Sequence, residues 1–261
     1  MANKPKIVFW DLETLPDPRV IYNNIPSIGA WPGRTFKAEL QSILSFGFKI
    51  DGDKKARCIN AWEFDSWSKD RHDDSALVQI IYDTLYDADE IVTHNGKAFD
   101  LKVLNTRLML FGMPPLPPLI KHVDTKIVLK NKISLYSNSL DNAAKFFSLD
   151  NKIHWANKWD TWGRFAFKED TKKDRAQMDK YCKMDVEVLQ QLYYKTMPLH
   201  GAYGINRALL DGRPVCPKCG EDKLIKHSTH KTTSAVYQRY LCTNCGATSR
   251  TDKKDNNPRC L

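Results

Sequence analysis

Two acidic residues follow the first strongly apolar segment of the chain. In KIVFWDLETLP, the apolar run 7–10 leads directly into Asp11, Leu12 and Glu13. A run this short and apolar is typical of a central strand buried on both faces, and side chains alternate along a strand, so Asp11 and Glu13 share one face. Two ionised carboxylates this close repel each other unless a cation lies between them. The segment therefore predicts either a cation site or a strand that has already reached solvent at Asp11.

Another acid lies on the apolar face of a predicted helix near residues 173–196. Tyr181 and Asp185 are four residues apart, so they share a face with Met178 and Leu189. An acid at this position points toward the core. A Tyr–Asp hydrogen bond at the margin of the helix is the alternative interpretation.

A further acid, Asp100, opens the helix predicted over DLKVLNTRLMLF. It occupies the first turn and precedes Leu101, Leu104 and Leu108 on the packed side. A capping or helix-dipole role could explain one such acid by itself.

The four acids lie on elements that pack against one sheet, so each can face a common point: Asp11, Glu13, Asp100 and Asp185. Buried carboxylates in this number require divalent cations, and oxygen ligands without a nearby His favour Mg²⁺ or Mn²⁺. Two such ions about 4 Å apart would bind the attacking and leaving oxygens of a phosphodiester. The pattern therefore predicts metal-dependent phosphodiester hydrolysis.

The elements that must position these acids are predicted from periodicity and turn signals. QSILSFGFKI and ARCINAW flank DGDKK as a β-hairpin, Ser75 caps a helix over LVQIIYDTLYDA, and EIVTH forms a short strand. A helix over NAAKFF begins at Ser139 and Asp141. Three early strands followed by alternating helices and a strand predict an α/β fold with a mixed sheet flanked by helices.

Three motifs, in this order, resemble those of the DEDD, proofreading-type 3′-to-5′ exonucleases of the ribonuclease H-like fold. FWDLET supplies Asp11 and Glu13, THNGKAFDLKVL supplies Asn95 and Asp100, and YCKMD supplies Tyr181 and Asp185. Tyr four residues before the last Asp is the pattern of the DEDDy branch. HVDT and SLDNAAKFF also look like family segments, and the resemblance extends over residues 5–197.

The resemblance implies a role for each motif residue. Asp11, Glu13 and Asp185 would hold one metal ion, Asp11 would also contact the second, and Asp100 would lie beside it or act through water. Tyr181, whose reference pKa is about 10, would orient the attacking water.

Asn95 would hydrogen-bond near the scissile nucleotide. The implied reaction is 3′-to-5′ hydrolysis of DNA, preferring single strands or frayed 3′ ends and releasing 5′-mononucleotides.

Other functions are compatible with the same residues. The alternatives are a 3′-to-5′ exoribonuclease, a structure-specific endonuclease and a nucleic-acid-binding protein without catalysis. Two departures from the family bear on substrate entry: Thr14, Leu15 and Pro16 stand where proofreading members often have a Gly, and the Pro-, Gly- and Asn-rich excursion at 17–38 has no family counterpart.

The C-terminal part carries two CxxC pairs, each followed by Gly: Cys216 with Cys219, and Cys242 with Cys245. Four thiolates in this arrangement are the ligands of one tetrahedral structural Zn²⁺, and a chain without a secretion signal disfavours disulfides. His227 and His230 lie between the pairs and are interpreted as loop residues. The module is too small to bury its own core, so we expect zinc to be needed for its folding.

Positive charge is concentrated in the same region. The formal charge is +9, and residues 201–261 hold 11 Lys and Arg against 5 Asp and Glu. The excess of positive charge favours a polyanionic partner such as nucleic acid. The alternative is that the excess charge only keeps the protein soluble. The basic residues interleave with Tyr237 and Tyr240 and are Lys218, Lys223, Lys226, Lys231, Arg239 and Arg250.

These observations predict an exonuclease domain at 1–200, a linker at 201–213 and a zinc ribbon with a basic tail at 214–261. No apolar run approaches the roughly 20 residues that span a bilayer, and MANKPK is not followed by a signal-peptide core, so we expect a cytoplasmic protein. An aromatic series at helical spacing, Trp155, Trp159 and Trp162, is interpreted as core packing rather than a base-stacking platform. The remaining cysteines have no partners at metal-ligand spacing and are Cys58, Cys182 and Cys260.

Overall fold

The computed structural model describes residues 5–15, 42–149, 158–200, 204, 206 and 215–250. The predicted excursion at 17–38, all of the predicted linker except Gly204 and Asn206, and the basic tail beyond Arg250 lie outside the described residues. So do Cys260 and the side chains of Trp155 and Trp159.

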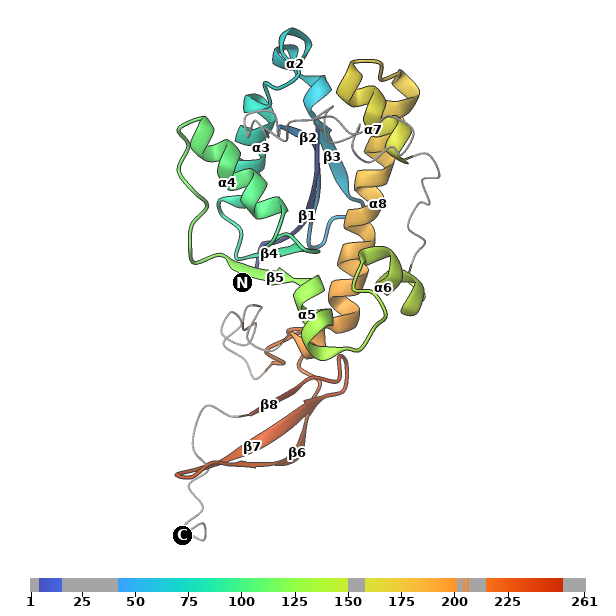
Figure 1. Cartoon of the computed structure of the whole chain (residues 1–261). Coiled ribbons are helices and arrows are strands. Elements are labelled where there is room, and N and C mark those ends of the chain that lie inside the picture. The colour runs from blue at the N-terminus through green and yellow to red at the C-terminus, as the bar shows by residue number, and fades with distance from the viewer. Residues whose placement is uncertain are drawn as a thin grey trace.

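A five-stranded sheet forms the centre of the larger part of the molecule, in the order β3-β2-β1-β4-β5 (Figure 1). The strands are β1 (Ile7–Thr14), β2 (Ile43–Ile50), β3 (Arg57–Asn60), β4 (Glu90–Thr93) and β5 (Lys121–Asp124). β2 runs antiparallel to β1 and β3, whereas β1, β4 and β5 are mutually parallel. The mixed sheet and the hairpin at DGDKK are as predicted, and β5 is a strand that the periodicity did not reveal.

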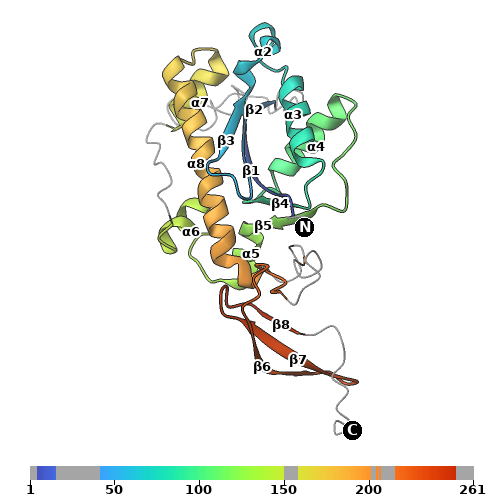
Figure 2. The same ribbon diagram turned by 180° about the vertical axis from the view of Figure 1, so that it is seen from behind.

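Helices cover both faces of this sheet (Figures 1 and 2). One face carries α3 (Ser75–Leu85) and α4 (Asp100–Leu110), and the other carries α8 (Lys172–Thr196) with α5 (Thr125–Lys132) and α6 (Leu140–Phe146) packed against it. The shorter elements are η2 (Ala61–Glu63), α2 (Asp65–Lys69), α7 (Lys158–Phe167) and η3 (Met197–Leu199). The predicted α/β fold is therefore confirmed.

Two of the predicted helix boundaries are confirmed and one is wrong. Ser139 caps α6 by accepting a hydrogen bond from the Asn142 N–H at 3.2 Å, and α4 ends before Gly112, whose φ is +66°. Ser75, however, is the first residue of α3 and not its cap. Its hydroxyl instead donates to the Asp73 carboxylate at 2.6 Å, because two acids immediately precede it.

The two faces of β1 face different parts of the core, as strand alternation requires. Val8, Trp10 and Leu12 belong to the apolar cluster that contains the buried side chains of α3 and α4. Ile7 and Phe9 belong to the cluster formed with α8. The face of β1 that continues to Asp11 and Glu13 is therefore the face that α8 covers.

The C-terminal residues 215–250 form a second, three-stranded antiparallel sheet next to the C-terminal end of α8 (Figure 1). Its strands are β6 (Leu224–Lys231), β7 (Val236–Cys242) and β8 (Thr248–Arg250), in the order β6-β7-β8. Cys219, in the turn that precedes β6, packs against the cluster that contains Ile7, Phe9 and Tyr193. No helix in the described ranges has the length and apolar character needed to cross a membrane.

A buried ion pair joins the α3–α4 layer to the sheet. Arg107 of α4 donates from Nε to Asp74 at 3.0 Å, and the other oxygen of Asp74 accepts the Ile43 N–H at the start of β2, at 2.6 Å. The side chains of Arg107 and Asp74 are 2% and 0% exposed. Removing one partner would leave a buried charge without compensation, which typically costs about 3–5 kcal/mol.

We therefore expect Arg107→Met to lower the free energy of unfolding by about 3–5 kcal/mol, measured by urea denaturation. The matched control is Lys145→Met, which breaks an ion pair with Asp141 whose side chains are 72% and 48% exposed, and which should cost below about 1 kcal/mol. Equal losses in the two variants would contradict the structural role assigned to the buried pair.

Candidate active site

Asp11 and Glu13 extend from β1 toward α8, at a point where the helix approaches the sheet closely. Asp11 pairs with Gly47 of β2. A Cβ atom at Gly47 would lie 2.8 Å from the Cys182 sulfur and 3.0 Å from the Cys182 carbonyl oxygen, both on α8. The absence of a side chain at Gly47 thus lets α8 lie close enough to bring its own acid beside Asp11.

The acid that α8 contributes is Asp185. One carboxylate oxygen from each of Asp11, Glu13 and Asp185 lies within 4.8 Å of the others. Asp185 is buried, whereas Asp11 and Glu13 are partly exposed. Three ionised carboxylates at this separation repel one another strongly, and hard oxygen donors of this kind fit Mg²⁺ or Mn²⁺. The cluster is therefore a candidate divalent-metal site.

Asp100 lies beside this cluster but outside the three-residue group. Its Oδ1 accepts a hydrogen bond from the Leu12 N–H, between the two acids of β1, at 2.9 Å. Burial, with a smaller contribution from the nearby charge of Asp124, raises the pKa of Asp100 to about 6. Three of the four predicted acids are thus within 4.8 Å of one another, and the fourth is hydrogen-bonded to the backbone between two of them.

Tyr181 lies one turn before Asp185 and is buried. Burial raises the pKa of its hydroxyl far above the usual value, and the negative charges of Asp185, Glu13 and Asp11 raise it further. The phenol therefore stays protonated in the absence of a cation. Trp162 of α7 packs edge-on against the Tyr181 ring at 6.2 Å and is buried, which supports the core-packing interpretation for Trp162.

Asn95 precedes α4 in the loop after β4 and is half-buried. It has a φ of +76°, which is uncommon for a residue with a side chain, and its N–H donates to the Asp124 carboxylate at 2.9 Å. The other Asp124 oxygen accepts the Lys97 N–H at 3.1 Å. Asp124 thus fixes the loop that leads into Asp100.

Sequence reasoning did not single out Asp124. This buried residue also caps α5, accepting hydrogen bonds from the Lys126 and Ile127 N–H groups. An Asp directly before a helix is a general capping signal and could have located the start of α5. Asp124 also binds the loop at 95–97 from another part of the chain. This contact depends on the pairing of β4 with β5, and no local sequence pattern predicts it.

The four C-terminal cysteines form a second cluster, in which the sulfurs lie within 4.8 Å of one another. Cys216 and Cys245 are 3.8 Å apart at sulfur, and Cys219 and Cys242 are 3.6 Å apart. Sulfurs about 2.3 Å from a tetrahedrally bound Zn²⁺ lie about 3.8 Å from each other, so the spacing fits this ion.

The glycines that follow the CxxC pairs and the histidines between the pairs can now be located in the structure. Gly220 and Gly246, which follow the CxxC pairs, have φ values of +79° and +73°, so both turns use the left-handed region that Gly adopts readily. His227 and His230 lie on β6, so the loop assignment was wrong, and neither belongs to the cysteine cluster. The strand continues through them because β7 pairs along it as far as Lys231.

Comparison with known proteins identifies the family of the chain. Residues 36–197 match the RNase H superfamily, and because the match covers more than half of the sequence, the chain belongs to that superfamily. This membership defines the class: an RNase H-like nuclease fold, associated with nucleic-acid substrates and divalent metal ions. The matched range includes Asp100 and Asp185 and begins after Asp11 and Glu13.

A solved structure with the same fold is the family B DNA polymerase from the hyperthermophilic archaeon Pyrobaculum calidifontis. The superposition has a TM-score of 0.53 at 14% identity and covers 88% of this chain and 31% of the polymerase chain. At this identity the likeness concerns the fold, and this chain spans about a third of the polymerase. No curated protein shows significant sequence similarity to the chain.

The cysteine cluster leads to a direct test. We expect the purified protein to contain about one Zn²⁺ per chain, measured by plasma mass spectrometry, and Cys216→Ser to lose it because three thiolates cannot complete the tetrahedral shell. Residues 215–250 should then become sensitive to protease. Cys58→Ser is the control and should retain zinc, since Cys58 lies outside the cluster. Full zinc content in the Cys216 variant would contradict the assignment.

Proposed function

We propose that this protein is a metal-dependent 3′-to-5′ exonuclease that acts on DNA, prefers single-stranded or frayed 3′ ends and releases 5′-mononucleotides. The observation that carries the proposal is the convergence of Asp11, Glu13 and Asp185 within 4.8 Å, with Tyr181 one turn before Asp185. The resemblance of the three motifs to the DEDDy pattern supports the same reaction and its direction.

The acidic residues would hold the metal ions. Asp11, Glu13 and Asp185 would coordinate Mg²⁺ or Mn²⁺, and Asp100 would take part directly or through water. When bound, such ions align the attacking water with the phosphorus and neutralise the charge that develops on the phosphodiester oxygens. With a pKa of about 6, the Asp100 carboxyl group is mostly ionised at neutral pH, and a cation bound nearby would favour the ionised form further.

Tyr181 would position the water for attack. Its hydroxyl stays protonated because burial and the neighbouring acids raise its pKa, so it can donate or accept a hydrogen bond but does not serve as a strong base. The edge contact with Trp162 restrains the ring. Asn95, held by Asp124 in a loop next to Asp100, would hydrogen-bond the terminal nucleotide.

A site formed between β1 and α8 would receive one strand end. Unpairing a terminal base pair costs a few kcal/mol or less, so single strands should be degraded faster than blunt duplexes. We also propose that residues 1–200 form the exonuclease domain and that residues 214–261 form a zinc ribbon that binds nucleic acid, joined by 201–213.

The direction of digestion can be tested with single-stranded DNA labelled at one end. With Mg²⁺ present, a 5′-labelled strand should yield a descending ladder, whereas a 3′-labelled strand should release labelled mononucleotide at once. RNA of the same sequence tests the exoribonuclease alternative, and a circular single strand tests the endonuclease alternative. Asp11→Asn, which removes one charge from the metal cluster, should lower the rate by at least about a hundredfold while leaving the fold intact.

Two results would contradict the proposal. Immediate release of labelled mononucleotide from the 5′-labelled strand would show that digestion begins at the 5′ end. Cleavage of the circular strand would show that the enzyme does not require a strand end. Undiminished hydrolysis by Asp11→Asn would show that the cluster of Asp11, Glu13 and Asp185 is not needed for the reaction.

A further inference from the structure

One face of the C-terminal sheet places two arginines directly opposite each other. Arg239 of β7 pairs with Arg250 of β8. His230 of β6 pairs with Tyr237, two residues before Arg239, so all four side chains lie on the same face. Like charges at directly opposed positions of a sheet destabilise it unless an anion neutralises them.

No acidic side chain of the sheet provides that anion. None of β6, β7 and β8 contains Asp or Glu. Among the ion pairs between described residues, none involves Arg239 or Arg250. Within the described part of the chain, the two guanidinium groups therefore form no ion pair that would neutralise their charge.

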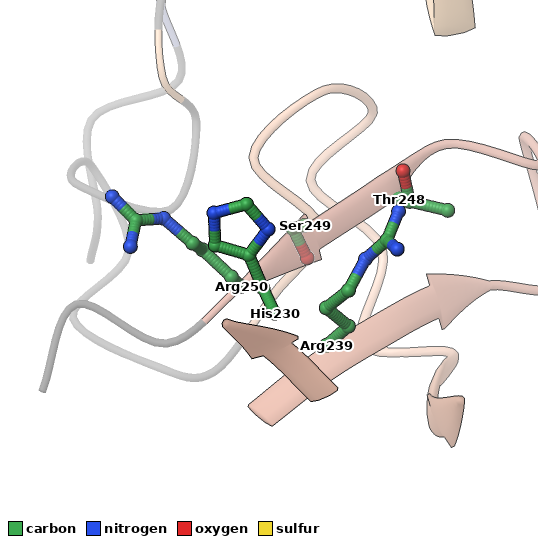
Figure 3. A pocket seen from close by; sticks show the side chains of 5 residues that line it. All are labelled: His230, Arg239, Thr248, Ser249 and Arg250. Carbon is green, nitrogen blue, oxygen red and sulfur yellow. The ribbon is translucent and has the colours of Figure 1, made fainter. Parts of the chain in front are cut away.

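The two arginines line a surface pocket of about 180 Å³ (Figure 3). The other lining residues are His230, Thr248 and Ser249, and the imidazole of His230 lies between the two guanidinium groups in this view. The Arg250 guanidinium lies over the Tyr237 ring, 4.0 Å from its centroid, which restrains it at the rim of the pocket. Guanidinium, imidazole and hydroxyl donors around one small pocket are the groups that bind a phosphate.

We infer that this pocket binds backbone phosphates of the nucleic-acid strand, at a site separate from the cluster of Asp11, Glu13 and Asp185. That the strand is the nuclease substrate rests on the proposed function; that the pocket binds phosphates does not. These side chains would contact phosphate groups and not bases, so the site would accept DNA and RNA alike.

The distance from the acidic cluster sets a minimum length for a strand that reaches both places. Asp185 lies 11 residues before the end of α8 at Thr196, which corresponds to about 16 Å of helix, and the ribbon begins beyond that end. One strand of a duplex advances about 3.4 Å along the helix axis per nucleotide. In a duplex-like form, a strand must therefore be longer than about five nucleotides to reach from one site to the other.

The experiment measures binding of a fluorescent single-stranded oligothymidylate by anisotropy, over a series of salt concentrations. All proteins carry Asp11→Asn to prevent digestion, so the result does not depend on whether the chain is an exonuclease. Arg239→Ala with Arg250→Ala should weaken binding about tenfold and reduce the slope of log affinity against log salt by about 1.4, as expected for two lost phosphate contacts.

The matched control removes two charges from the opposite face of the same sheet. Lys226 pairs with Tyr240 and Lys231 with Val236, so both alternate with the pocket residues, and both are exposed. The sequence groups these lysines with Arg239 and Arg250, but the pairing of β6 with β7 puts them on the other face, so Lys226→Ala with Lys231→Ala should weaken binding less than about twofold. Equal losses in the two double variants would overturn the proposal, because net charge alone would then account for binding. No loss in either variant would also overturn it, because neither face would then contribute to binding.

A further variant keeps the test decisive. Arg239→Lys with Arg250→Lys preserves both charges and serves if the alanine variant fails to retain zinc; it should bind several-fold more weakly, since Lys cannot make paired bonds to a phosphate, and unchanged affinity would overturn the proposal.

Discussion

The repulsion among Asp11, Glu13 and Asp185 is the constraint on which the rest of the site depends. Their carboxylate oxygens lie within 4.8 Å of one another, an arrangement that is unfavourable without a cation and that only a rigid frame can hold. The frame consists of β1, buried on both sides, and α8, which lies close to it across Gly47. The apolar core thus stabilises a cluster that electrostatics alone would disperse.

A second group of residues holds the surroundings of that cluster in place. Asp124 binds the loop at 95–97 and caps α5, so one carboxylate joins β5, α5 and the approach to Asp100. Arg107 and Asp74 join α4 to β2 on the opposite face of the sheet. At the far end of α8, Tyr193 donates a hydrogen bond to the buried Glu90 at 2.6 Å and belongs to the cluster against which Cys219 packs. The cysteine module therefore packs against the core cluster to which the helix carrying Tyr181 and Asp185 contributes.

The sequence predicts the parts of the site that local periodicity determines. Alternation along a strand placed Asp11 and Glu13 on one face, and four-residue spacing placed Tyr181 with Asp185, because both rules follow from backbone geometry alone. Ser75 was misplaced as a cap because its hydroxyl donates instead to the Asp73 carboxylate.

Features that depend on strand pairing were beyond local reasoning. Asp124 acts on a loop about 30 residues earlier in the chain through the parallel neighbours β4 and β5. The opposition of Arg239 and Arg250 requires the register of β7 and β8. In the sequence these arginines are only two members of a basic segment, and their shared pocket becomes visible only when the sheet is assembled.

The central claim is that Asp11, Glu13 and Asp185 hold divalent metal ions. Crystals of the protein soaked in Mn²⁺, measured at a wavelength where manganese scatters anomalously, test it most directly. We predict two anomalous peaks about 4 Å apart, bounded by these three carboxylates, and loss of both in Asp11→Asn. Absence of any peak at the three carboxylates, with Mn²⁺ bound elsewhere, would contradict the account.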